Sequence, residues 1–339
     1  MTQRTRYFLV GSSLIVVVGL ATGLVATYNG NLSLSSAPSE FSYMPAESTA
    51  VAYADVRAIM SSDFRQKLRQ VLPTGQETDR LKQEIGVDIE HDIDTVVAGF
   101  TGSDPSKGGA VVLVRGRFND GQIETIARQH GATVEEYKGK RMLLMAGDGT
   151  VMKGEYPNHT FEHPTAGVAF VEPGLLALGD AASIKRAIDT ASSGNDFTKN
   201  TDLMKLVDDV RGASTAWVVG RFDEISQANI PAEVKEHLPA VQFFAVSAHV
   251  NGGLSGTLRA DTRDEQSATD LKAVITGGLA AGRLMAGQDA RANSILNSVK
   301  VGGTNKTVTL AFTLPPELLD VLNGVAAAQR LGTGGGVRK

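Results

Sequence analysis

The hydrophobic pattern of the chain begins with a long apolar run at residues 7–28, interrupted only by small and hydroxyl side chains. As a helix rising about 1.5 Å per residue, this run is ~33 Å long and crosses a ~30 Å hydrocarbon core. Arg4 and Arg6 precede the run, and the next positive residue is Arg57. Because positive flanks stay in the cytoplasm, residues 1–28 are predicted to be a cytoplasmic N-terminus and a transmembrane anchor.

A cleaved signal peptide is the alternative interpretation of this segment. Such a peptide has an apolar core of ~7–15 residues that ends at a small-residue cleavage site. Here the run is longer, and the small-residue motifs lie within it or directly before Pro38. We therefore expect an uncleaved anchor in the bacterial inner membrane, with the remaining chain in the periplasm. Residues 29–43 are polar and rich in Ser, Asn and Gly, which is typical of a flexible linker.

Beyond the linker, short apolar runs separated by cap and turn residues predict a first folded half at residues 44–195. Ser61 and Ser62 are candidate caps for a helix that Pro73 stops, and Gly147-Asp148-Gly149 marks a hairpin turn. The other expected elements are strands at 51–56, 95–101, 110–117, 168–171 and 175–178 and helices at 77–85, 121–130 and 181–191, the last capped by Asp180.

A second half at residues 196–331 resembles a degenerate repeat of the first. The openings Ser48-Thr49-Ala50-Val51 and Ser214-Thr215-Ala216-Trp217 correspond, as do Gly108-Gly109-Ala110 and Gly252-Gly253-Leu254, each followed by a strand and a helix. The second of these helices is expected at 264–285, with an apolar stripe of Leu271, Ile275, Gly278 and Leu279. A strand at 308–314, a last helix opened by Pro315 and bearing Leu318, Leu322 and Val325, and a loose tail at 332–339 complete the prediction.

This alternation of short-range strand pairs and helices is typical of an α+β fold. We expect an extracytoplasmic region that is internally duplicated, with largely antiparallel sheets and helices packed on one face.

Several segments carry a resemblance to a known family. They are the opening Ser48-Thr49-Ala50, the stretch Ile85–Asp94 with Thr95-Val96-Val97, and the pair Val168–Val171 and Leu178-Gly179-Asp180 with the helix Ile184–Ile188. Together they resemble bacterial membrane-anchored envelope proteins of the acidobacterial type, whose function is unknown. The resemblance covers most of residues 44–325 and implies a fold and a compartment. It implies no functional residues, because its motifs are strand openings, turns and caps.

Composition narrows the function classes. The chain has 33 Lys and Arg against 37 Asp and Glu, a net charge of −4, which argues against nucleic acid as a partner. It has no cysteine, which excludes disulfides, thiol catalysis and cysteine-ligated zinc.

Two patterns are candidates for metal binding. His159, Glu162 and His163 match H-x-x-E-H, a zinc-protease motif that needs both imidazoles on one helical face. Pro164 biases the preceding residue away from helical angles, so we expect no zinc site there. The acidic residues Asp88, Asp92 and Asp94 are a candidate cation site, but they lack the ligand alternation and central glycine of an EF-hand loop.

Gly19 and Gly23 form a G-x-x-x-G step in the anchor, the spacing that lets two membrane helices approach closely and predicts a homodimer contact. No catalytic or cofactor-binding constellation is recognisable, and we expect no cofactor. The leading hypothesis is a non-enzymatic, membrane-anchored protein that binds another envelope component, as an accessory or assembly subunit of a membrane complex. The alternatives are a periplasmic module that binds a small ligand in a cleft between the two halves, or an anchored hydrolase.

Overall fold

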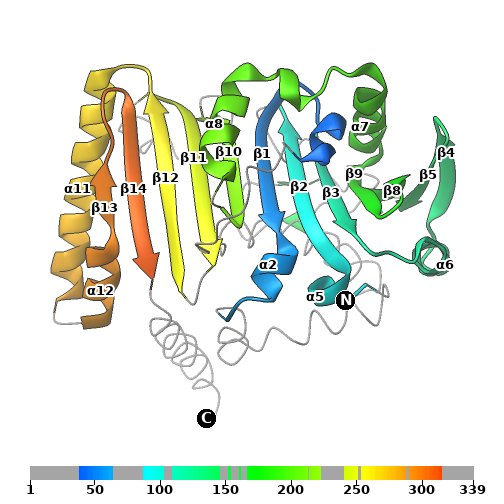
Figure 1. Ribbon diagram of the computed structural model, residues 1–339, viewed down its shortest axis with the longest axis horizontal. Coiled ribbons are helices and arrows are strands. Elements are labelled where there is room, and N and C mark those ends of the chain that lie inside the picture. Colours follow the sequence, from blue (N-terminus) through cyan, green and yellow to red (C-terminus); the bar gives the residue numbers. More distant parts are fainter. Residues whose placement is uncertain are drawn as a thin grey trace, which may run out of the picture.

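The fold is dominated by one antiparallel sheet of twelve strands (Figure 1). The computed structural model describes residues 38–63, 87–102, 109–145, 152–153, 160–161, 166–212, 214–222, 240–250, 253–287 and 290–314. A separate two-stranded sheet pairs β6 (Met152–Lys153) with β7 (Thr160–Phe161). The protein is therefore a mixed helix and sheet protein with a large antiparallel sheet, as the sequence pattern predicts.

The predicted first half supplies one side of this sheet. Its strands are β1 (Ser48–Asp55), β2 (Ile93–Thr101), β3 (Ala110–Gly116), β4 (Thr133–Tyr137), β5 (Lys140–Met145), β8 (Ala166–Glu172) and β9 (Leu175–Asp180). Its helices are α2 (Val56–Met60), α5 (Ile89–Asp92), α6 (Asp120–Gln129) and α7 (Ala181–Ser193). The side chain of Asp180 accepts a hydrogen bond from the Ser183 backbone N–H at 2.9 Å, which confirms the predicted cap of α7.

The predicted second half supplies the other side. Its elements are η3 (Phe197–Lys199), α8 (Thr201–Arg211), β10 (Ala216–Arg221), β11 (Val241–Val250), β12 (Leu254–Thr262), α11 (Glu265–Ala286), α12 (Ala290–Ser298), β13 (Lys300–Gly302) and β14 (Thr307–Leu314). The predicted long helix and late strand are confirmed as α11 and β14. Asp264 caps α11 by accepting from the Ser267 backbone N–H at 2.8 Å.

The two sides meet at the antiparallel pair β1–β10, where Val51 lies opposite Val219. Outward from this pair the strand order is β1-β2-β3-β9-β8 on one side and β10-β11-β12-β14-β13 on the other. On each side a helix, α6 or α11, follows the third strand along the chain. The last two strands on each side form a hairpin, β8–β9 or β13–β14. The second strand of this hairpin, β9 or β14, pairs with the third strand, β3 or β12. The hairpin β4–β5 extends the first side only.

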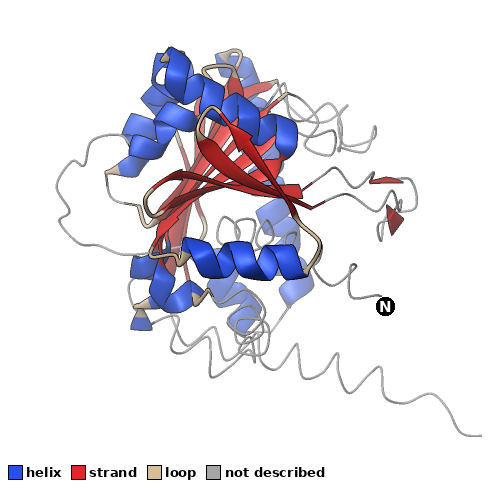
Figure 2. Cartoon of the chain, turned by 90° about the vertical axis from the view of Figure 1, so that its right-hand side faces the viewer, coloured by secondary structure: helices blue, strands red, loops and turns tan. Residues whose placement is uncertain are grey.

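Helices cover both faces of the sheet, so the prediction of helices on one face is wrong (Figure 2). Val97 of β2 shares a buried cluster with Ile184 of α7 and Leu206 of α8. The next residue of β2, Ala98, shares another cluster with Ile89 of α5. Because successive strand residues point to opposite faces, α7 and α8 cover one face and α5 the other. The central strands are apolar on both faces, and such strands need cover on both sides.

The folded part begins earlier than predicted. Residues 39–43, predicted as the end of the linker, form the 3-10 helix η1 (Ser39–Tyr43). The Phe41 side chain is 1% exposed and its ring meets that of Phe197 edge-on, with ring centroids 5.0 Å apart. In the sequence, Phe41 and Tyr43 stand among polar residues, so no apolar pattern marks this short segment as part of the fold.

One predicted cap is partly described and one turn differs from the prediction. Ser61 is the C-cap of α2, whereas Ser62 directly precedes a helical residue, Asp63. The rest of the helix expected up to Pro73 lies outside the described residues. The strand pair after α6 turns at Lys138-Gly139, where both residues have positive φ. The expected hairpin turn at 147–149 lies outside the described residues.

The predicted anchor at residues 7–28, with Gly19 and Gly23, also lies outside the described residues. Among the helices that the structure describes, none combines the length and apolar character needed to cross a membrane.

Candidate functional site

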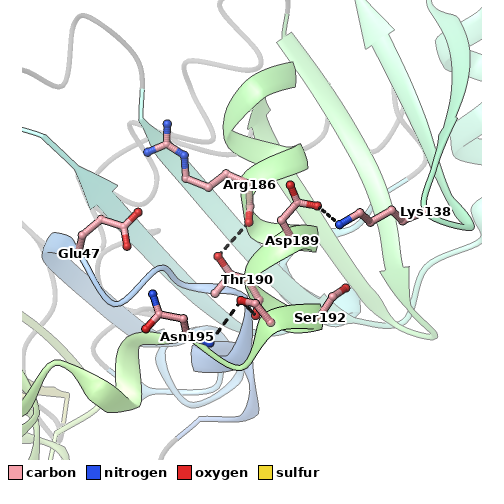
Figure 3. A pocket seen from close by; sticks show the side chains of 8 residues that line it. Glu47, Lys138, Arg186, Asp189, Thr190, Ser192 and Asn195 are labelled. Atoms are coloured by element: carbon pink, nitrogen blue, oxygen red, sulfur yellow. Dashed lines mark hydrogen bonds and ion pairs between the residues drawn. The ribbon is translucent and has the colours of Figure 1, made fainter.

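A polar pocket of about 440 Å³ lies beside the C-terminal part of α7 (Figure 3). Its lining combines the helix with the β4–β5 turn and the residue before β1, and comprises Glu47, Lys138, Arg186, Asp189, Thr190, Ser192, Ser193 and Asn195. These side chains meet there because Lys138 projects from a tight hairpin turn and α7 ends at Gly194, which adopts the left-handed conformation.

Most of the polar groups in the pocket are bonded to each other. Lys138 Nζ lies 2.7 Å from Asp189 Oδ1, and the Tyr137 hydroxyl donates to the same carboxylate at 3.1 Å. The hydrogen bond to Asp189 raises the pKa of Lys138, and the same bond lowers the pKa of the Asp189 carboxyl. Thr190 donates to the Arg186 carbonyl at 2.9 Å. The pocket is thus a hollow at a helix end whose lining carries two acidic and two basic side chains and contains no histidine.

A second polar cluster holds η1 on the sheet. The buried Glu40 carboxylate accepts from Arg115 Nε at 2.5 Å, and Arg115 also lies 3.6 Å from Glu172. The Tyr43 hydroxyl donates to Glu172 at 3.1 Å. Burial, with the Glu172 charge and hydrogen bond as smaller causes, raises the pKa of Tyr43 to about 12. This cluster attaches η1 to the sheet, and its charged groups are paired with each other, which is typical of a structural role.

The acidic residues that were a candidate cation site have separate partners. Asp88 caps α5 and contacts His91 at 3.1 Å, whereas Asp92 accepts from the Asp88 backbone N–H at 2.8 Å. Asp94 is paired with Arg57 and lies 3.6 Å from Arg117. Over the described ranges, no group of His, Asp or Glu side chains is arranged to hold a metal ion.

The H-x-x-E-H segment is only partly described. His159, Glu162 and His163 lie outside the described residues, so the expectation about zinc stays a prediction. The two residues between the first histidine and the glutamate, Thr160 and Phe161, form β7 and pair with β6.

Among the described residues, the outer side of α11 has an unusual composition for an exposed surface. Its N-terminal turns expose polar residues, among them Glu265, Gln266 and Asp270. From Ala273 to Ala286, by contrast, the only charged side chain is Arg283. The exposed residues of this part that fall on one helical stripe are Val274, Gly277, Gly278, Ala281, Leu284 and Met285, here called the α11 stripe.

Large apolar groups stand in solvent on this stripe. Val274 is 54% exposed, Leu284 83% and Met285 89%. The sheet-facing side of the same helix is already packed, because Ala268 and Leu271 are buried with Val308. A helix that is apolar on its inner and outer sides is normally covered on both. The sequence shows the low charge of this helix but does not show which side the sheet takes: Gly278, predicted on the packed stripe, is exposed.

Comparison with known proteins places the chain in no family. No family model matches the sequence, and no curated protein matches it. Among solved structures, it is similar to crystal form I of TP0453, with 10% sequence identity, coverage of 86% of this chain and 99% of that chain, and a TM-score of 0.44. A TM-score this low supports no conclusion about function.

Proposed function

We propose that the protein is a membrane-tethered, extracytoplasmic binding protein that binds another protein chain of the envelope through the α11 stripe. The exposure of Val274, Leu284 and Met285 on one stripe is the observation that carries the proposal. Contiguous exposed apolar side chains on an otherwise polar surface mark protein interaction sites. The tether is the apolar run at residues 7–28, which supports a single-pass anchor and a periplasmic location for the folded part.

The family resemblance fits this proposal. It rests on strand openings, turns and caps, of which the β8–β9 hairpin and the Asp180 cap are present. An origin of the folded part by duplication belongs to the same proposal. It is supported by the equal strand order on the two sides of the β1–β10 pair.

A small-ligand module has less support. That alternative places a cleft between the two halves, but β1 and β10 are hydrogen-bonded neighbours in one sheet. The pocket beside α7 is elsewhere, and its Lys138–Asp189 pair already satisfies two of its charges. Small-ligand sites are usually apolar and concave, with a few polar groups left to orient the ligand.

A photo-reactive residue placed at Leu284 in the membrane-bound protein tests the proposal. We expect a covalent protein adduct after illumination. The matched control is the same residue at Gln266, which is also exposed on α11 but lies among polar neighbours, and it should give no adduct. Equal yields at the two positions, or no adduct at Leu284, would contradict the proposal.

A further inference from the structure

We infer that the partner seated on the α11 stripe is a second copy of this chain, bound through antiparallel packing of the two α11 helices. This inference rests on the proposed function and names its partner. It is drawn from the order of side-chain sizes along the stripe, the space around its glycines, its charge and its area.

The α11 stripe is self-complementary in an antiparallel pair. Large side chains stand at its two ends, Val274 at one and Leu284 and Met285 at the other, with Gly277, Gly278 and Ala281 between them. A two-fold axis near the middle of the stripe places Val274 of one copy against Met285 of the other. The small residues then face each other, which allows the helices to approach closely, while the large ends cover the flanks.

The two central glycines are better explained by a close neighbour than by the fold. A Cβ added at Gly277 or at Gly278 would meet no atom within 4 Å. Neither glycine needs a positive φ. Glycine inside a helix destabilises it relative to alanine, so two adjacent glycines weaken α11 although no close contact within the chain requires them. A second helix packed across them supplies the missing reason.

Charge on the stripe does not oppose self-association. Arg283 lies outside the stripe, on the far side of the helix, and its guanidinium is turned to α12, with hydrogen bonds to Asn297 Oδ1 and the Leu296 carbonyl, both at 3.3 Å. Two copies therefore meet without bringing like charges face to face. The helix dipoles of an antiparallel pair also oppose each other favourably.

The area is sufficient for a weak, specific dimer. With the three large side chains 54%, 83% and 89% exposed, a symmetric pair buries on the order of 1,000 Å² in total, the lower bound for a specific interface. Such an interface is weak in dilute solution. Two copies held in one membrane have a raised effective concentration, which favours the dimer.

Cysteine cross-linking of the full chain in lipid membranes tests the inference, because the protein has no cysteine of its own. Chains carrying Val274→Cys are mixed with differently tagged chains carrying Met285→Cys and treated with a bis-maleimide of about 8 Å span. In the antiparallel pair these sites are adjacent, so mixed cross-links are expected. Each site is about 16 Å along the helix from its own twin, so links between identical chains are not expected.

Gly278→Leu is the second variant. It should raise the melting temperature of the monomer by ~2–4 °C, since leucine favours helix and has open space, and abolish the mixed cross-link. A variant that only damaged the fold would lower both. Gln266→Leu, on the polar part of α11, should leave the cross-link unchanged.

The outcomes separate this inference from the proposed function. Links only between identical sites, or no links, would overturn the antiparallel dimer. An adduct at Leu284 with the mass of a different protein would overturn the dimer but keep the docking function. An adduct with lipid, or with the chain's own residues 315–339, would overturn both. Mixed links together with an adduct of twice the chain mass would support both.

Discussion

Replacement of Arg115 by leucine should detach η1 and lower the stability of the whole sheet. The Glu40 side chain is 5% exposed and accepts from Arg115 Nε at 2.5 Å; its other partner among the described residues is the Ser39 hydroxyl at 3.3 Å. Breaking a buried ion pair from one side costs about 3–5 kcal/mol because a charge is left uncompensated. Arg115 is 31% exposed, so water reaches the vacated side and we expect the low end, about 3 kcal/mol.

The assay is urea unfolding of the full chain in a mild detergent, followed by the fluorescence of Trp217. This residue is the single tryptophan, is 3% exposed, and meets the Phe41 ring edge-on with centroids 6.1 Å apart. The emission of Trp217 therefore reports directly on the packing of η1 against the sheet. With a slope of ~3 kcal/mol per molar urea, the loss moves the midpoint by ~1 M.

A second substitution separates the charge from the packing. Adding Glu40→Gln to Arg115→Leu removes the uncompensated carboxylate and should restore about 1–2 kcal/mol. Arg128→Leu is the matched control, since its pair with Glu124 lies on the surface of α6 and contributes no more than ~0.5 kcal/mol. If Arg115→Leu costs no more than this control, or if the double variant recovers nothing, the buried pair does not hold η1.

Three further perturbations have definite outcomes. Tyr43→Phe should lower stability by about 1 kcal/mol at pH 7 through loss of its hydrogen bonds. Because burial raises the pKa of Tyr43 from 10.0 to about 12, the native protein loses stability as pH rises from 10 to 12, and in urea titrations Tyr43→Phe should flatten this alkaline limb. The bond to Lys138 lowers the pKa of Asp189, so the stability that this ion pair contributes is present above about pH 4 and is lost in acid. The melting temperatures of wild type and Asp189→Asn should therefore converge as the pH falls below about 4, and a constant gap would refute a stabilising Lys138–Asp189 pair. Gly99→Ala should destabilise by about 1–3 kcal/mol in calorimetry because its Cβ would overlap Met44 Sδ, whereas Gly212→Ala, in open space with an ordinary φ, should be neutral or slightly stabilising; equal effects would count against the packing argument.

Local signals in the sequence were sufficient for the elements that neighbours along the chain determine. The β8–β9 hairpin has its turn at Pro173-Gly174, and the predicted cap of α7, Asp180, accepts a hydrogen bond from the Ser183 backbone N–H. Such signals depend on a few adjacent residues, so the sequence alone is enough to predict these elements.

Long-range arrangement was not readable in the same way. Apolar residues of η1 find their partners more than a hundred residues away, as the contact between the Phe41 and Phe197 rings illustrates, and no local pattern encodes that contact. The side of α11 that packs on the sheet is also not predictable from the sequence, for a related reason. A helix that is apolar on most of its circumference has no single direction that periodicity can assign to the core. The sheet decides which side is buried, and the remaining side becomes the candidate docking surface.

The position of η1 also determines how the protein responds to tension. A pull on the N-terminus enters at Ser39 and reaches the sheet through the Glu40–Arg115 pair and the backbone bond from Phe197 N to the Met44 carbonyl, 2.7 Å long. Phe197 precedes α8, which leads into β10, while Met44 leads into β1. We therefore expect a load to be shared by the two central strands, and η1 to detach before either strand is sheared from its neighbour.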